Sequence, residues 1–335
     1  MHRICQVGLG PLGRRLLTDL FRRGLGSVQA VVDPAFAGEP LSKHVQGAPE
    51  GLLILPSIEA VEDWSGIRCT LVSTQSDLEL CMETFQGLLL RGQAVISTCE
   101  ELSWPWLRHP VLAATLHELA VKHDGRILGT GVNPGFLMDV LPVVGSTLCD
   151  EVRSMKIERI QEASARRLPF QKKIGASLSV TDFEARVQEG SLRHVGLGES
   201  LHAVAHYLGM KLARWEETLV PVLAERELNC GLGPIPIGHA AGVHQEARAW
   251  DAEGKLLLEL IFHAAIGTEE PRDAVHIEGT PRFSLVIPGG VDGDAATSAV
   301  VLNSIRALLG AERGLHTMSS LPTQGCAPRP SFAGR

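Results

Sequence analysis

The chain has 335 residues, of which 44% are hydrophobic, and a formal net charge of -7. Because this length exceeds the usual size of a single hydrophobic core, we expect two domains. The acidic balance and the lack of a basic stripe argue against nucleic acid as a partner, since its backbone recruits clustered Lys and Arg. No apolar run approaches the roughly 18 residues that cross a bilayer. We therefore expect a cytoplasmic protein with no membrane partner.

Short β-branched runs alternate with helical patterns over the first 150 residues, which is typical of a parallel sheet with crossover helices. The predicted helices cover residues 12–24 and 77–92, and Asp77 is the predicted N-cap of the second. The predicted strands are residues 3–10, 28–33, 67–74, 93–98 and 126–131.

The pattern changes near Asp150, which is the only clear domain boundary. Long strand-like segments follow, and the turn at residues 251–254 predicts a hairpin, so we expect a mostly antiparallel sheet. Helices are predicted at 181–189, 199–212 and 294–310, and the tail after Leu321 is expected to be poorly ordered. The predicted strands of this part are residues 151–163, 217–228, 242–251 and 255–267.

A glycine signature follows the first predicted strand. Gly8, Gly10 and Gly13 form G-x-G-x-x-G together with Pro11 and Leu12. Glycines at this spacing permit a tight turn and a close approach of a pyrophosphate to the following helix. The pattern therefore predicts a dinucleotide site.

An acidic residue, Asp33, ends the second predicted strand, twenty residues after Gly13 (33 - 13 = 20). A carboxylate there accepts hydrogen bonds from ribose hydroxyls and repels a 2′-phosphate. No Lys or Arg occurs in the segment that follows, 34–42. NAD is therefore favoured over NADP as the cofactor.

Three loops follow later strands of the same sheet, at residues 72–77, 97–102 and 129–136. A dinucleotide bound across such a sheet places its nicotinamide half near the carboxyl ends of these strands. The loops contribute six further candidate cofactor residues: Ser73, Thr74, Thr98, Cys99, Asn133 and Pro134.

Two adjacent carboxylates, Glu100 and Glu101, follow the strand at 93–98. Acids also stabilise the first turn of a helix, so the pair has a purely structural interpretation. As a chemical group, a carboxylate is a poor partner for an oxyanion but neutralises an iminium or ammonium and can accept its proton. The pair thus favours reduction of an imine or oxidation of an amine.

The histidines, the cysteines and one basic segment give weaker indications of function. His202 and His206 lack the partners of a zinc motif, and the seven cysteines include no C-x-x-C pair, so we expect no metal and reduced thiols. The segment "RRLPFQKK", residues 166–173, is either a solvated charged loop or a holder for a carboxylate or phosphate. No nucleophile elbow or phosphate-binding lysine motif is present.

Taken together, "GLGPLG", "STCEELSWPW", "GTGVNPGFLMD", "RRLPFQKKIGASL" and "HVGLGESL" resemble the 2,4-diaminopentanoate dehydrogenases and the related native amine dehydrogenases. The likeness implies an α/β Rossmann dinucleotide-binding domain like that of dihydrodipicolinate reductase, and an α+β C-terminal domain with a mostly antiparallel sheet. The expected division is a cofactor domain at 1–140, a substrate and dimerisation domain at 141–290, a helix at 291–320 that returns to the first domain, and a flexible tail at 321–335.

The resemblance also implies an NAD(P)-dependent oxidoreductase that deaminates a primary amine or diamino acid, and in reverse aminates a ketone with ammonia. It implies a homodimer and a catalytic glutamate in "CEEL", for which Glu101 is the first choice and Glu100 the second. Arg166 and Arg167 are candidates to hold a substrate carboxylate. Phe136, Leu137 and Phe170 are candidates to line an apolar pocket.

Two other functions stay open on the sequence. A reductase like dihydrodipicolinate reductase would reduce a C=N or C=C bond in a cyclic carboxylated substrate and would need no ammonia. A dimer that binds NAD without catalysis would show saturable cofactor binding and no turnover.

Overall fold

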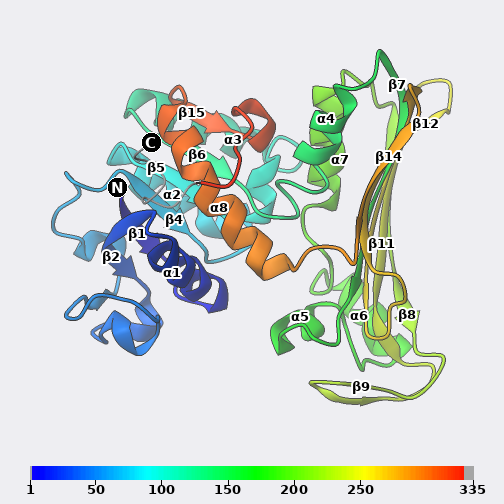
Figure 1. The fold of residues 1–335 in the computed structure, drawn as a ribbon, viewed down its shortest axis with the longest axis horizontal. Helices are drawn as coiled ribbons and strands as arrows, with labels where there is room; N and C mark the ends of the chain where they lie inside the picture. The colour runs from blue at the N-terminus through cyan, green and yellow to red at the C-terminus, as the bar shows by residue number, and fades with distance from the viewer. Residues whose placement is uncertain (1, 328–335) are drawn as a thin grey trace. The chain divides into compact units, whose positions relative to one another are not determined.

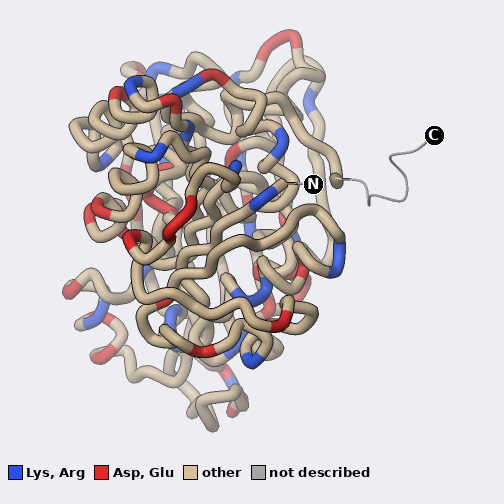
Figure 2. The backbone as a smooth tube through the Cα atoms, turned by 90° about the vertical axis from the view of Figure 1, so that its left-hand side faces the viewer, with Lys and Arg blue, Asp and Glu red and all other residues tan. Residues whose placement is uncertain are grey.

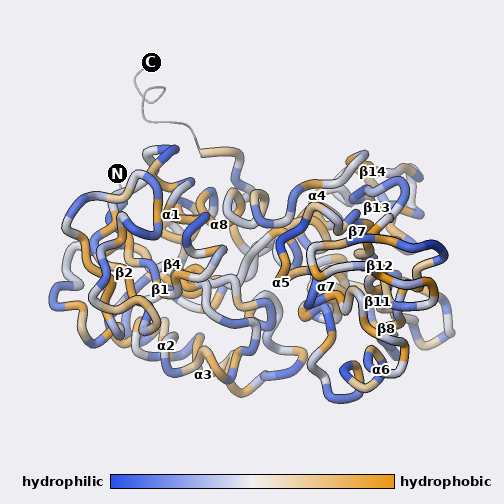
Figure 3. The backbone as a smooth tube through the Cα atoms, turned by 90° about the horizontal axis from the view of Figure 1, so that it is seen from below, coloured by the Kyte–Doolittle hydropathy of each residue, from blue (hydrophilic) through white to orange (hydrophobic). Residues whose placement is uncertain are grey.

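The computed structural model describes residues 2–327. It divides into two compact units, which we describe separately (Figure 1). Unit 1 comprises Met1–Phe136 and Asp292–Arg335, and unit 2 comprises Leu137–Val291. Figure 3 shows hydrophobic stretches within the sheets of both units, whereas Lys and Arg are interspersed with Asp and Glu along the backbone in Figure 2.

Unit 1 is built on a seven-stranded parallel sheet with the order β15-β6-β5-β4-β1-β2-β3. The strands β2 and β3 extend from β1 toward one edge of the sheet, and β4, β5 and β6 extend from β1 toward the other edge. The strands β1 and β4 therefore lie side by side near the middle. The Rossmann-type domain expected from the sequence is therefore present. Its strands are β1 (His2–Val7), β2 (Gly26–Val32), β3 (Ile54–Leu55), β4 (Cys69–Val72), β5 (Ala94–Ser97), β6 (Arg126–Gly129) and β15 (Gly314–His316).

Helices α1 (Pro11–Arg23) and α8 (Gly293–Gly310) pack together in unit 1. Leu16 and Leu20 of α1 join Leu302 and Ile305 of α8 in one core cluster. A buried hydrogen bond from Ser298 Oγ to Asp19 Oδ2 (2.8 Å) also joins the two helices. The last α-helix of the described residues, α8, is thus part of the unit that contains α1.

A second core cluster in unit 1 contains α2 (Leu78–Leu90) and α3 (Pro110–Lys122). The predicted N-cap is confirmed, because the Asp77 side chain accepts a hydrogen bond from the Leu80 N–H. The sequence analysis missed α3, although Pro110 at its first position is a start signal. Short 3-10 helices are η1 (Pro34–Phe36), η2 (Leu41–Lys43), η3 (Ile58–Ala60), η4 (Glu100–Ser103) and η5 (Met318–Ser320).

The end of the described chain stays in contact with unit 1. Asn303 Oδ1 accepts hydrogen bonds from the Arg23 guanidinium (2.7 Å) and from the Ala327 N–H (3.0 Å). Leu321 is buried. The rest of the segment expected to be flexible, residues 328–335, lies outside the described residues.

Unit 2 has a six-stranded sheet with the order β14-β13-β7-β12-β11-β8, and this sheet is mixed. The expectation of a mostly antiparallel sheet is therefore wrong. The reason is that β7 does not pair with the next strand along the chain. It lies between β13, which is antiparallel to it, and β12, which is parallel to it. The strands are β7 (Glu151–Glu162), β8 (Arg214–Leu223), β11 (Ala240–Trp250), β12 (Leu256–Ala265), β13 (Arg272–Thr280) and β14 (Phe283–Pro288), with a separate hairpin of β9 (Leu228–Cys230) and β10 (Gly233–Ile235).

The hairpin predicted at residues 251–254 joins β11 to β12, as expected, and the Asp251 N–H donates to the Lys255 carbonyl (3.1 Å). Helix α7 ends at Tyr207, earlier than predicted, because Gly209 takes a left-handed φ of 65°. The segment 166–173 is not a loop throughout, since a short helix, α5, starts at Leu168. The helices of unit 2 are α4 (Val140–Ser146), α5 (Leu168–Lys173), α6 (Val180–Gln188) and α7 (Leu197–Tyr207).

Candidate active site

The glycine turn between β1 and α1 is closely packed on itself. Gly8 has φ of 88°, and a Cβ there would lie 2.7 Å from the Ser73 carbonyl oxygen. A Cβ on Gly13 would collide with the Gly8 carbonyl. By contrast, a Cβ on Gly10 would meet nothing within 4 Å, and Gly10 offers no side-chain cap to α1. The turn therefore has the open helix N-terminus that a pyrophosphate needs, and the residues fit a dinucleotide.

Two polar side chains, those of Gln6 and Ser73, form hydrogen bonds that support this turn. Gln6 is fully buried in β1, and its Nε2 donates to the Gly8 carbonyl and to Ser73 Oγ, both at 2.8 Å. Ser73 Oγ also donates to the Gly8 carbonyl (3.2 Å). Thr74 is near as well, since its Cγ2 would lie 2.9 Å from a Cβ on Gly8. Ser73 and Thr74 are thus brought to the glycine turn, and the supporting role of Gln6 was missed.

Asp33 lies directly after β2 and is fixed by two backbone N–H groups. Its Oδ2 accepts from Leu9 (2.7 Å), inside the glycine turn, and its Oδ1 accepts from Ala35 (2.9 Å). Next to it, the Arg14 guanidinium lies 4.8 Å from the centre of the Phe36 ring. The candidate ribose-binding acid and the glycine turn are therefore one connected structure.

The acidic pair lies in η4, and two residues, Thr98 and Cys99, separate it from the end of β5. Glu101 is buried, at 3% exposure, whereas Glu100 is half-buried. One oxygen of Glu101, Oε2, accepts a hydrogen bond from the Leu78 N–H at the start of α2 (2.9 Å) and lies 3.1 Å from His109 Nε2. The sequence did not separate the two acids, but the structure gives them different environments.

The position of η4 depends on Gly129, the last residue of β6. A Cβ on Gly129 would lie 2.6 Å from the Leu102 carbonyl oxygen and 2.7 Å from the Ser103 nitrogen. Only a residue without a Cβ permits this approach of β6 to η4. The backbone of η4, which carries Glu101, is therefore fixed by a contact that the sequence pattern does not reveal.

Two buried thiols, those of Cys99 and Cys81, lie near the acidic pair. The Cys99 Sγ is 3.2 Å from the Ser76 carbonyl, and both Cys99 and Cys81 are buried. A hydrogen bond between the two thiols lowers the pKa of Cys81 to about 7. The same bond, together with burial, raises the pKa of Cys99. The Cys99 side chain, predicted as a cofactor contact, is thus turned toward α2, while Thr98 is half-buried beside it.

The turn after β6 contains Asn133 and Pro134. It folds tightly, because Gly135 has φ of 126° and a Cβ there would lie 2.7 Å from the Gly131 carbonyl. The Val132 N–H donates to Thr297 Oγ1 of α8 (3.2 Å). The side chain of Thr297 therefore ties this turn to the last helix, a contact 165 residues apart in sequence that the sequence could not indicate.

The candidate substrate residues divide between the units. Phe136 is half-buried at the end of the first segment of unit 1, and Leu137 is buried at the start of unit 2. In unit 2, the Arg166 guanidinium lies 4.1 Å from the centre of the Phe170 ring and donates to Gln161 Oε1 (3.2 Å). Arg167 is exposed at the N-cap of α5.

The histidines set aside in the sequence have other contacts. His202 Nδ1 lies 2.9 Å from the Gly198 carbonyl, and the His206 ring packs on Tyr207. Within residues 2–327, no group of three or more His, Cys, Asp or Glu side chains is arranged to hold a metal ion. Over the same residues, no helix combines the length and the apolar character that a bilayer span requires.

Comparison with known proteins gives similarities to a family model, a sequence relative and solved structures. Residues 136–328 match the family model of the 2,4-diaminopentanoate dehydrogenase C-terminal domain. A 2,4-diaminopentanoate dehydrogenase from Acetoanaerobium sticklandii is 28% identical over 330 residues, which cover 96% of this chain and 93% of the relative. An amine dehydrogenase from Mycobacterium smegmatis has the same fold, with a TM-score of 0.84 at 19% identity over 98% of each chain.

A more distant structural similarity is to a myo-inositol dehydrogenase from Corynebacterium glutamicum. Its TM-score is 0.56 at 11% identity, over 93% of this chain and 90% of the other. The two-unit fold is therefore shared with other dehydrogenases.

Gly129→Ala should destabilise unit 1, because the added methyl group overlaps the backbone of η4. The expected loss is about 1–3 kcal/mol of unfolding free energy, measured by chemical denaturation. Gly310→Ala is the matched control, since a Cβ there would meet nothing within 4 Å. Equal unfolding free energies of the two variants would show that β6 and η4 leave room for a Cβ on Gly129.

Proposed function

The chain belongs to the 2,4-diaminopentanoate dehydrogenase C-terminal domain family, and on that premise we propose that it is an NAD(P)-dependent amine dehydrogenase. In one direction it oxidises a primary amine or a diamino acid to a ketone and ammonia. In the other it aminates the ketone. The proposal places the enzyme among the oxidoreductases that act on CH–NH2 groups.

The observation that carries the proposal is the environment of Glu101. It is a buried carboxylate in η4, which follows β5 of the parallel sheet, and it is fixed through Oε2 by the Leu78 N–H and His109. A fixed anion favours a cationic nitrogen centre over an alcohol or ketone oxygen, on which negative charge develops. The residue is also able to accept a proton from that nitrogen.

In the proposed reaction, each group of residues has a separate role. The glycine turn and Asp33 bind the dinucleotide, and when bound the nicotinamide accepts or supplies the hydride. In the oxidation direction, Glu101 takes a proton from the substrate ammonium, and the C=N bond forms as hydride leaves the carbon. Water then releases ammonia and the ketone. In the amination direction, Glu101 neutralises the iminium that ammonia and the ketone form.

Glu101→Gln should lower kcat by about a hundredfold or more, because the amide neither neutralises the nitrogen nor accepts its proton. The assay is oxidation of NADH by short ketones and by 2-amino-4-oxopentanoate, with and without ammonium. We expect a strict ammonium requirement in the wild-type protein and a Kd for NADH within about twofold of wild type in the variant.

The matched comparison is Glu100→Gln, which alters the neighbouring and less buried acid. It should keep most of the activity. The assignment fails if Glu101→Gln turns over normally, or if only Glu100→Gln is inactive. The proposed function itself fails if ketones are reduced equally well without ammonium.

For the cofactor, we propose that NAD is favoured over NADP. The Asp33 carboxylate is held by the Leu9 N–H where a ribose would lie, so a 2′-phosphate would meet a fixed negative charge. The nearby Arg14 lies over Phe36, and it is the cation in this region that an NADP preference would use.

Asp33→Asn should weaken NAD binding by about tenfold, because charge-assisted bonds to the ribose contribute about 1.5–3 kcal/mol. It should bind NADP better than the wild type does, since the repulsion is gone. Titration of intrinsic fluorescence with each cofactor measures both. An unchanged NAD-to-NADP ratio would contradict the role of Asp33.

For the substrate, we propose two alternatives that the ketone panel separates. A carboxylated substrate would be held by Arg166 and Arg167, which form a basic pair before α5. A simple amine would instead bind in an apolar pocket lined by Phe136, Leu137 and Phe170. Preference for 2-amino-4-oxopentanoate over a simple ketone of similar length favours the first alternative.

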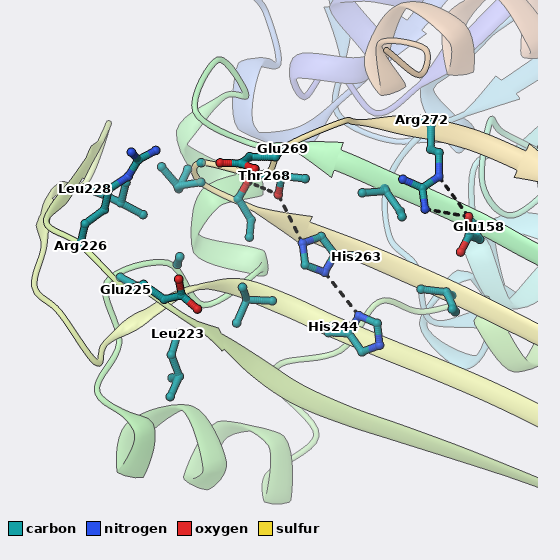
Figure 4. Close-up of a pocket in the computed structure, with 18 residues that line it drawn as sticks. Glu158, Leu223, Glu225, Arg226, Leu228, His244, His263, Thr268, Glu269 and Arg272 are labelled. Atoms are coloured by element: carbon teal, nitrogen blue, oxygen red, sulfur yellow. Dashed lines mark hydrogen bonds and ion pairs between the residues drawn. The ribbon is translucent and has the colours of Figure 1, made fainter. Parts of the chain in front are cut away.

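We also propose that the protein is a homodimer formed through the sheet of unit 2. Figure 1 shows α4, α5 and α7 on one side of this sheet, and we call the opposite side the open side. The open side has a hollow of about 730 Å³ that includes a hydrogen-bonded row of His244, His263 and Thr268 (Figure 4). Burial lowers the pKa of both imidazoles, which favours their neutral form. Neutral rings cost less free energy to enclose under a second chain than charged rings do.

Light scattering should therefore give about twice the chain mass of 36.0 kDa. Thr218 is on the open face of β8, opposite Glu246 of β11. Thr218→Arg should lower the measured mass toward one chain, because it adds a bulky charge to this face. A wild-type protein that is monomeric at micromolar concentration would contradict the dimer.

A further inference from the structure

The buried position of Glu101 raises a question about its proton. Under the proposed function, each amine oxidation leaves a proton on this carboxylate, and the side chain is only 4% exposed. A group so enclosed needs a route to solvent before it can act again. The inference below rests on the proposed function, and it gives His109, which so far only fixes Glu101, a second role.

A row of three titratable side chains runs outward from Glu101 within unit 1. His109 Nε2 lies 3.1 Å from Glu101 Oε2, and the opposite ring nitrogen, Nδ1, lies 3.6 Å from Glu79 Oε1. The exposed fractions of these side chains rise along the row, from 4% for Glu101 to 17% for His109 and 70% for Glu79. The His109 ring therefore lies between a buried carboxylate and an exposed one, with a hydrogen bond on its Nε2 side and a longer ion-pair contact on its Nδ1 side.

The local structure explains why these groups meet. Glu101 lies in η4, Glu79 is in the first turn of α2, and His109 is the residue directly before Pro110 at the start of α3. The Leu78 N–H, one residue before Glu79, fixes the same Glu101 oxygen that His109 contacts. Three separate elements of one unit thus converge on Oε2.

We propose that His109 is a positioning residue that holds Glu101 and conducts its proton to Glu79 and the solvent. With Glu101 ionised and the ring neutral, the Nε2–H donates to Oε2 and Nδ1 carries the lone pair. When Glu101 takes the substrate proton, exchange with water moves the ring proton from Nε2 to Nδ1, so that the Nε2 lone pair faces the Oε2–H. The Oε2–H bond then breaks as the Nε2–H bond forms, and the proton on Nδ1 leaves to Glu79 Oε1 or to water, which restores the first state. One proton enters the ring and one leaves, so charge and atoms balance.

Other charged and titratable groups face this row. Cys99 and Cys81 lie on the α2 side of Glu101, and Asp77 caps α2 beside them. The lowered pKa of Cys81, about 7, arises from its bond with Cys99 and gives that thiol a titration near neutral pH. A change in the pH dependence of turnover therefore has to be compared in a Cys81→Ser background.

His109→Gln is the decisive variant, because its amide can still donate to Oε2 while it cannot conduct a proton. We expect KM for the amine and Kd for NAD within about twofold of wild type, and kcat for amine oxidation at least about tenfold lower. The solvent deuterium isotope effect on kcat should rise, and added imidazole should restore part of the rate. Glu79→Gln should cause a smaller loss, since water can accept the Nδ1 proton.

His123→Gln, at the other end of α3, is the matched control and should behave as wild type. A His109→Gln enzyme with wild-type kcat and isotope effect would overturn the relay. Loss of rate in His109→Gln that imidazole does not restore, with an unchanged isotope effect, would overturn it as well, because it indicates a structural role alone.

A second readout does not depend on activity. In nitrogen–proton correlation spectra of the His109 ring, the proposal predicts a proton on Nε2 in the resting protein and a changed Nε2 resonance in Glu101→Gln. Identical ring spectra of the two proteins would show that the His109–Glu101 bond is absent. If the wild type shows no ammonium-dependent turnover but the ring spectra change, the proposed function fails while the link stands.

Discussion

The candidate site depends on one buried carboxylate and the groups that bond to it. An ionised side chain inside a protein is tolerated only when donors replace the lost water, and Glu101 has two of them on a single oxygen. The Leu78 N–H comes from a helix start and His109 from the residue before the next helix. The same contacts that make the burial acceptable also fix the direction in which the carboxylate can act.

The parallel sheet of unit 1 explains why these groups gather. Its strands end along one edge, so the loops after β1, β2, β4, β5 and β6 all lie at the same side of the sheet. The glycine turn, Asp33, η4 and the turn at Asn133 occupy those loops. A close backbone contact at Gly129 fixes η4 against β6, and Thr297 of α8 fixes the turn beyond it. The chain thus uses its last helix to complete a site formed by its first 136 residues.

Local patterns were sufficient for part of this site. The three glycines and Asp33 are recognisable because both the turn and the spacing are properties of one short βαβ unit. The environment of the acids was not recognisable, since it depends on His109 and Leu78, which come from other elements. Gln6 was missed because a polar residue within a strand gives no sign of the turn that it supports. In unit 2, β7 pairs with β12 in a register that joins Met155 to Leu258 (258 - 155 = 103 positions apart), and no hydrophobic pattern specifies this pairing.

We propose that the fixed carboxylate selects nitrogen over oxygen at the reacting carbon. The measurement that tests this selection supplies the protein with a ketone, deuterated NADH and nitrogen-15 ammonium, and analyses the product by mass spectrometry. We expect an amine that contains both the deuterium and the heavy nitrogen, from the wild-type protein and not from Glu101→Gln. A deuterated alcohol without nitrogen would contradict it.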